Sequence, residues 1–120
     1  MNTKKDFLKR AHKFSINTIH FTEKLPNKRS FWVISDQLIR SACSIGANMT
    51  EANSASSKKD YINFYSYALK SANESKYWLA LLSDLIPSSS DLISLINETD
   101  ELSKILGASI VTMKRNLKKI

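Results

Sequence analysis

Basic side chains are the residues of this chain whose type and number could support chemistry with a partner. The 120 residues include 18 lysines and arginines against 11 aspartates and glutamates, so the formal net charge is +7 at pH 7. This excess permits an anionic partner such as nucleic acid, for which phosphate contacts dominate the affinity. The same charges also favour solubility, so the composition leaves both interpretations open.

Side chains that could catalyse a reaction are few and scattered. His12 and His20 are more than two helical turns apart, so they cannot share a metal ion without outside ligands, and we expect both at the surface. Cys43 is the only cysteine, which excludes an intrachain disulfide and favours a small packed residue. The sequence contains no phosphate-binding loop, dinucleotide-binding, zinc-protease or nucleophile-elbow motif. We therefore expect no enzymatic activity, no cofactor and no metal.

The composition predicts long helices with few connections. Only two glycines and two prolines occur, and a sheet protein of this length would need more of both for its turns. No uncharged run approaches the roughly 18 apolar residues of a membrane helix, and the N-terminal segment has no apolar run like that of a signal peptide. We expect a cytoplasmic protein with no membrane partner, and the single cysteine fits such a reducing compartment.

Apolar residues recur every three or four positions in four segments, which predicts four helices. The first covers residues 3–23 and ends before Pro26, which disfavours helix in the preceding residue. The second covers residues 30–52. Gly46 lies inside it and has two explanations, a close approach of another backbone or a tolerated glycine.

The third predicted helix begins at the capping residue Ser57, three residues before Asp60, and carries either Phe64 or Tyr65 on its apolar stripe. It ends at Pro87, and the serines that follow can cap a fourth helix. Short connections make sequential helices antiparallel neighbours. The sequence therefore predicts an all-α fold, an up-down-up-down antiparallel four-helix bundle in a single domain of residues 1–120.

Antiparallel packing brings both termini and the loop between the second and third helices to one end of the bundle. We call this the basic end, because eleven basic residues collect there against few acids, chiefly Asp6, Glu51 and Asp60. It is a candidate site for nucleic-acid phosphates. The alternative is that its charges match the helix dipoles and favour solubility. We expect no stacking aromatic residues beside it, which disfavours sequence-specific recognition of single strands. Its basic residues are Lys4, Lys5, Lys9, Arg10, Lys13, Lys58, Lys59, Lys114, Arg115, Lys118 and Lys119.

The loop between the second and third helices also predicts which of their residues lie at the same height. Arg40 falls level with Ser71 and Glu74, and Trp32 falls beside Trp78. An ion pair between Arg40 and Glu74 would fix the register if partly buried. An exposed pair would contribute only about 0–1 kcal/mol.

Two segments are apolar over more of their circumference than a monomeric bundle needs. Residues 31–34 read Phe-Trp-Val-Ile, and residues 77–82 read Tyr-Trp-Leu-Ala-Leu-Leu. Extra apolar width of this kind should face another subunit, so we expect a homo-oligomer. The alternative is that these side chains fold over the core of their own bundle. Closed cyclic symmetry is expected for such an assembly, but the residues do not fix the number of subunits.

The second and third helices also carry a distinctive polar run. Residues 36–52 read DQLIRSACSIGANMTEA, and residues 57–61 read SKKDY. These segments resemble the Q-I-R-R-A-x-x-S-I-x-x-N-I-A-E-G and Ser-x-Lys-Glu-Phe elements of a bacterial four-helix-bundle family encoded in 23S rRNA intervening sequences. Gly46 stands where that family usually has Pro, and Ala55 where it often has Arg, which removes one basic group beside the loop. The polar positions that match the family are Arg40, Asn48, Glu51, Ser71 and Glu74.

This resemblance implies a four-helix bundle that assembles as a ring-like homopentamer. It also implies a relation to the accessory protein of diversity-generating retroelements, a basic, barrel-shaped partner of nucleic acid and of a reverse transcriptase. Most members have no assigned activity, so we expect the matching polar positions to be architectural. The prediction is a non-enzymatic oligomeric scaffold that binds RNA or DNA phosphates at its basic end, with a reverse transcriptase or another protein as a further partner. The alternative is a structural or protein–protein interaction oligomer with no nucleic-acid role.

Overall fold

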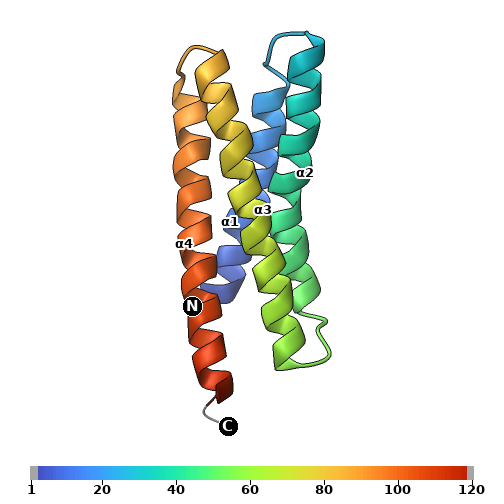
Figure 1. The fold of residues 1–120 in the computed structure, drawn as a ribbon, viewed down its shortest axis with the longest axis vertical. Coiled ribbons are helices and arrows are strands. Elements are labelled where there is room, and N and C mark those ends of the chain that lie inside the picture. The colour runs from blue at the N-terminus through green and yellow to red at the C-terminus, as the bar shows by residue number, and fades with distance from the viewer. Residues whose placement is uncertain (1–2, 119–120) are drawn as a thin grey trace.

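Four long helices make up the structure, a computed structural model that describes residues 3–118. They are α1 (Thr3–Thr22), α2 (Arg29–Ala52), α3 (Lys58–Leu85) and α4 (Ser90–Lys118). The helices run antiparallel in chain order and form a bundle of 53 × 24 × 22 Å (Figure 1). The predicted all-α, up-down-up-down fold is confirmed. None of the four described helices combines the length and apolar character needed to cross a membrane.

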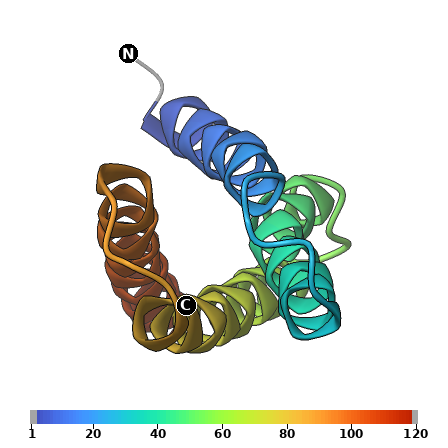
Figure 2. The same cartoon turned by 90° about the horizontal axis from the view of Figure 1, so that it is seen from above.

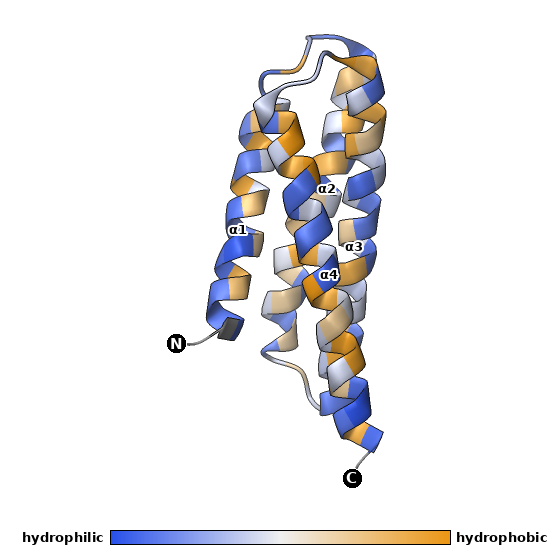
Figure 3. Ribbon diagram, turned by 90° about the vertical axis from the view of Figure 1, so that its left-hand side faces the viewer, coloured by the Kyte–Doolittle hydropathy of each residue, from blue (hydrophilic) through white to orange (hydrophobic). Residues whose placement is uncertain are grey.

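Each helix contributes one apolar stripe to a continuous core, coloured orange on the inner faces in Figure 3. Burying one large aliphatic or aromatic side chain contributes about 1.5–3 kcal/mol, so these stripes dominate the packing energy. On α3 the stripe uses Tyr65, which is buried, while Phe64 is only half-buried. On α4 the buried stripe stops at Ile110, because the last turns of this helix extend beyond the other three (Figure 1).

Serine side chains begin the two C-terminal helices. The Asp60 N–H donates to Ser57 Oγ at 3.0 Å, which confirms the predicted cap of α3. The short Asp60 carboxylate accepts from the Ser56 N–H at 3.2 Å, one residue before the partner that a full capping box would use. At the start of α4, the Leu92 N–H donates to Ser89 Oγ at 3.1 Å. Each such cap stabilises its helix by about 1 kcal/mol.

A buried pair of serines fixes the register between α2 and α3. Ser41 Oγ and Ser75 Oγ lie 2.8 Å apart, so one hydroxyl donates to the other. The accepting hydroxyl can in turn donate to a backbone carbonyl of its own helix, that of Leu38 for Ser41 or that of Ser71 for Ser75. Both serines are buried, and their small side chains leave room for the two helices to pack closely. A polar contact inside the core therefore aligns the two helices.

This register differs by a few residues from the predicted one, so two predicted pairs are wrong. Arg40 and Glu74 are both exposed, and neither takes part in an ion pair among residues 3–118. The indoles of Trp32 and Trp78 do not pair either. Trp32 Nε1 donates to Asn27 Oδ1 at 2.9 Å, and Trp78 packs edge-on against Tyr77 with ring centroids 5.0 Å apart.

The bundle is least tightly closed between its first and last helices. In the view along the bundle, α1 and α4 stand apart, whereas helices that follow one another in the chain lie close together (Figure 2). Two ion pairs cross this opening, Arg10 with Glu98 near mid-height and Lys24 with Asp91 at the far end. One cavity lies on either side of the Arg10–Glu98 pair along the bundle, and residues of α1 and α4 line both. We call the space that these two cavities occupy the α1–α4 groove.

Gly46 faces α1 with room to spare. A Cβ atom placed on Gly46 would lie 3.6 Å from the Cβ of Ala11, an ordinary van der Waals distance. The backbones therefore do not require a glycine at this contact, and the structure supports a tolerated glycine.

Replacing Gly46 with Ala should therefore raise the free energy of unfolding by about 1 kcal/mol, because alanine loses less backbone entropy in a helix. Urea denaturation of the purified protein measures this change. Gly46→Leu is the control, since its longer side chain would overpack the contact with Ala11 and cost about 1–3 kcal/mol. A loss of stability in Gly46→Ala would show that the two helices need closer contact than the structure has.

Candidate nucleic-acid interface

The basic end lies where α1 and α3 begin and where α2 and α4 finish (Figure 1). Lys58 and Lys59 occupy the first turn of α3, and their side chains are exposed. The exposed bases Lys114, Arg115 and Lys118 lie on the last turns of α4. Lys4 and Lys5 come from the first turn of α1, whereas Lys119 lies outside the described residues. The topology thus gathers these charges from three helices.

Arg10 and Lys13 do not belong to this cluster. They lie further along α1, and Arg10 makes a two-pronged contact with Glu98 in which its Nε donates to Oε2 at 3.1 Å. The hydrogen bond to Glu98 raises the pKa of Arg10 above its ordinary value. Lys13 lines a cavity together with Glu98 and Glu101. Arg10 is thus a bridge across the α1–α4 groove, and its charge is compensated by α4.

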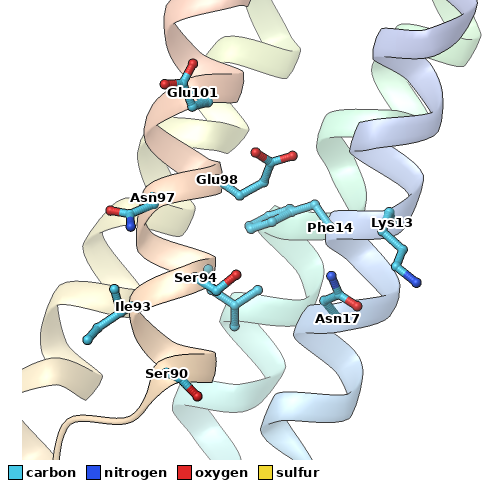
Figure 4. Close-up of a pocket in the computed structure, with 10 residues that line it drawn as sticks. Lys13, Phe14, Asn17, Ser90, Ile93, Ser94, Asn97, Glu98 and Glu101 are labelled. Carbon is cyan, nitrogen blue, oxygen red and sulfur yellow. The ribbon is translucent and has the colours of Figure 1, made fainter.

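The cavities of the two halves of the bundle differ in charge. In the half away from the basic end, a cavity of about 650 Å³ is lined by Glu98 and Glu101 as well as Lys13. Figure 4 shows Phe14 and Glu98 pointing into this space from opposite helices. A neighbouring cavity of about 400 Å³ is lined by Asp91 and Lys24. An anion entering either one would meet carboxylates.

Three further cavities lie at the basic end, with volumes of about 520, 270 and 240 Å³. Lysines line all three: Lys4 the first, Lys4 and Lys5 the second, and Lys58 the third. Within the described part of the chain, no carboxylate lines any of them. The charged side chains that line these three cavities are therefore all basic, in contrast to the cavities of the other half.

Aromatic rings lie directly among these lysines, so the expectation that none would do so is wrong. Tyr61 and Tyr65 stack with ring centroids 4.9 Å apart and an interplanar angle of 23°. Lys4 Nζ lies 4.4 Å from the centroid of the Tyr61 ring. In the sequence, Tyr61 and Tyr65 are four residues apart in the first turns of α3, shortly after Lys58 and Lys59. Residues at this spacing are neighbours on a helix surface, so the sequence does contain a sign of this cluster.

The two phenols form a hydrogen-bonded pair. Tyr61 Oη donates to Tyr65 Oη at 3.3 Å. Burial raises the pKa of Tyr65 far above its ordinary value, and the hydrogen bond with Tyr61 raises it further. Tyr65 is thus held as a neutral phenol that supports the ring of Tyr61.

The polar positions that match the family do not converge on a site. Arg40, Glu51 and Glu74 are exposed. Asn48 Nδ2 donates to the Ser44 carbonyl at 2.8 Å within α2, and the Ser71 carbonyl accepts from Ser75 Oγ. Asn48 and Ser71 thus take part in hydrogen bonds within their own helices, and none of the five residues lines a cavity described above.

The histidines and the cysteine occupy the kinds of positions expected for them. His12 and His20 are exposed, and His20 Nδ1 lies 3.5 Å from Glu23 Oε1. Cys43 is half-buried on α2. No three His, Cys, Asp or Glu side chains within residues 3–118 gather as a set of metal ligands.

The raised pKa of Tyr65 predicts a pH dependence of stability. The folded state favours the protonated phenol, so this contribution is fully present below the ordinary tyrosine pKa of about 10 and is lost as the pH rises above it. Tyr65→Phe has no such proton to lose. Its free energy of unfolding should decline less than that of the wild type between about pH 9.5 and 11.5, measured by urea denaturation at each pH.

Tyr67→Phe is the matched control, because Tyr67 is an exposed tyrosine on the same helix. This variant should keep the pH dependence of the wild type. Identical curves for all three proteins would show that Tyr65 is not held in its neutral form by the fold.

Comparison with known proteins agrees with this architecture. A crystal structure of a protein with unknown function from the S23 ribosomal protein family of Bacteroides thetaiotaomicron VPI-5482 is similar, with a TM-score of 0.79 and 35% sequence identity. The similarity covers 87% of this chain and 97% of that one. No curated protein matches the chain. The model of the 23S rRNA-intervening sequence protein family matches residues 3–108. The chain therefore belongs to the 23S rRNA-intervening sequence protein family.

Proposed function

We propose that this protein is a non-enzymatic, homo-oligomeric scaffold that binds the phosphates of RNA or DNA through its basic end. The observation that carries the proposal is the separation of charge between the two halves of the bundle. Among the described residues, lysines but no carboxylates line the cavities at the basic end, whereas Asp91, Glu98 and Glu101 line those in the other half. The family name refers to rRNA genes and assigns no ligand, so the support comes from the charges themselves.

Dipole matching explains part of this arrangement but not all of it. Asp91 near the start of α4 and Arg115 and Lys118 near its end follow the helix dipole. Lys4, however, lies at the start of α1, where the dipole disfavours positive charge. Its placement there supports a role in binding an anionic partner.

Self-association is supported by apolar side chains near the other end of the bundle. Trp32, Val33 and Tyr77 are 56%, 53% and 58% exposed, so they do not fold over their own core. Trp32 and Val33 come from the first turns of α2, and Tyr77 from the second half of α3. Exposed apolar side chains of this kind favour contact with another copy, and we propose a closed ring, specifically a pentamer.

The same exposed residues favour one other candidate function, a structural or protein–protein interaction oligomer without a nucleic-acid role. In that case a reverse transcriptase or another protein would be the partner, and the basic end would serve solubility. The two candidates differ in how binding of nucleic acid responds to salt and to the basic residues.

Neutralising the end of α4 tests this difference. The triple variant Lys114→Gln, Arg115→Gln and Lys118→Gln should bind a short RNA duplex at least about tenfold more weakly at 50 mM salt, because fewer counterions are released. The slope of log affinity against log salt concentration should also become shallower by about 2–3, one for each lost phosphate contact. Fluorescence anisotropy across a salt series measures both quantities.

A variant of equal charge change serves as the control. Lys28→Gln, Arg29→Gln and Lys70→Gln removes three exposed bases that lie away from the basic end. It should bind with nearly the affinity and slope of the wild type. If both triple variants lose affinity equally, net charge and not the basic end is responsible. If the wild type ignores RNA even at low salt, the second candidate function is favoured.

A further inference from the structure

The tyrosine pair at the start of α3 forms a rigid aromatic surface. Tyr65 is only 5% exposed, and it holds Tyr61 through ring stacking at 4.9 Å and the hydrogen bond between the phenols. Tyr61 itself is half-buried. A half-buried ring that is fixed from below loses little freedom when a second flat group stacks on it.

Tyr61 also borders two cavities. The cavity of about 520 Å³ in the α1–α4 groove is lined by Phe7, Tyr65 and Met113 in addition to Tyr61. The cavity of about 240 Å³ lies toward the end of α4 and includes Met113 and Asn116. Walls that are mainly apolar and aromatic, with a few polar groups, are typical of sites for small planar ligands, and the larger cavity falls in the usual range of about 300–1,000 Å³.

Two lysines lie beside this aromatic surface. Lys4 Nζ lies 4.4 Å from the Tyr61 ring centroid, and the Lys4 side chain is otherwise exposed. Such a contact at an exposed site is weak, so a stacked base can replace the ammonium group, which then becomes available to a phosphate. Lys58 borders the smaller cavity beside Asn116. The surface thus offers an aromatic ring and phosphate-binding lysines within one site.

We infer that Tyr61, supported by Tyr65, is a stacking platform for an unpaired nucleobase of single-stranded nucleic acid, whose flanking phosphates contact Lys4 and Lys58. This inference rests on the proposed function and adds the class of ligand. Single strands are bound in this manner because every base has a π-face that can stack on an aromatic side chain. A duplex keeps its bases stacked on one another, so it reaches the lysines but not the platform.

The test compares three probes of equal length on the wild-type protein: a single-stranded 12-mer, the same 12-mer with abasic sugars in place of nucleotides, and a duplex. Fluorescence anisotropy at low and moderate salt should show about tenfold tighter binding of the intact single strand than of the abasic strand. Ribose and deoxyribose forms of each probe show which nucleic acid is preferred, and a base-dependent gain with either form supports the platform.

Variants of Tyr61 locate the effect. Tyr61→Ala should remove the advantage of the intact strand while leaving abasic binding within about twofold of the wild type. Tyr61→Phe keeps the ring and should retain the advantage. Tyr67→Ala, at an exposed tyrosine elsewhere on α3, should also retain it. Circular dichroism verifies that each variant is folded.

The outcomes separate this inference from the proposed function. Equal affinity of the wild type for intact and abasic strands overturns the platform while leaving phosphate binding in place. An equal loss for both strands in Tyr61→Ala overturns it as well, because the ring would then act without regard to bases. Absence of salt-sensitive binding to all three probes overturns the platform and the proposed function together.

Discussion

The antiparallel packing of four apolar stripes is the constraint on which the rest of the structure depends. Each stripe is long, and the connections are too short to let sequential helices run in parallel. Both described chain ends and the α2–α3 loop therefore lie at the same end of the molecule (Figure 1). Packing in the core thus decides where distant lysines meet, although no lysine takes part in that packing.

The antiparallel packing also determines which charged side chains of different helices lie near one another. Carboxylates on the first half of α4 lie opposite the middle and end of α1, where Glu98 and Asp91 bind Arg10 and Lys24. These contacts bridge the most open side of the bundle, although exposed pairs contribute only about 0–1 kcal/mol each. Among the described residues, no carboxylate lines the cavities that Lys4 and Lys58 border near the other end of α4. The charged side chains that line these two cavities are therefore all basic.

Much of the fold could be predicted from the sequence because periodicity and capping are local. The helix that begins after Ser57 and the break at Pro26 depend on neighbouring residues alone. Register is different, because it depends on how closely two backbones approach. The contact between Ser41 and Ser75 sets it, and neither serine stands out in the sequence.

The candidate site shows the same division between local and three-dimensional information. Topology alone was sufficient to place Lys58 and the end of α4 together. The ion pair of Arg10 with Glu98 could not be predicted, because such a prediction needs the distance between α1 and α4 at that height of the bundle. The stack of Tyr61 on Tyr65 is difficult to predict, because a stripe of apolar residues explains aromatic side chains at this spacing equally well.

The proposed oligomeric, RNA-binding scaffold is best tested by its mass in solution, measured by light scattering with and without a short RNA. We expect a particle several times the 13.6 kDa of one chain, five times for the proposed ring, that gains RNA mass at low salt and loses it as salt is added. A particle of 13.6 kDa whose mass does not change with RNA at low salt would contradict both the assembly and the binding.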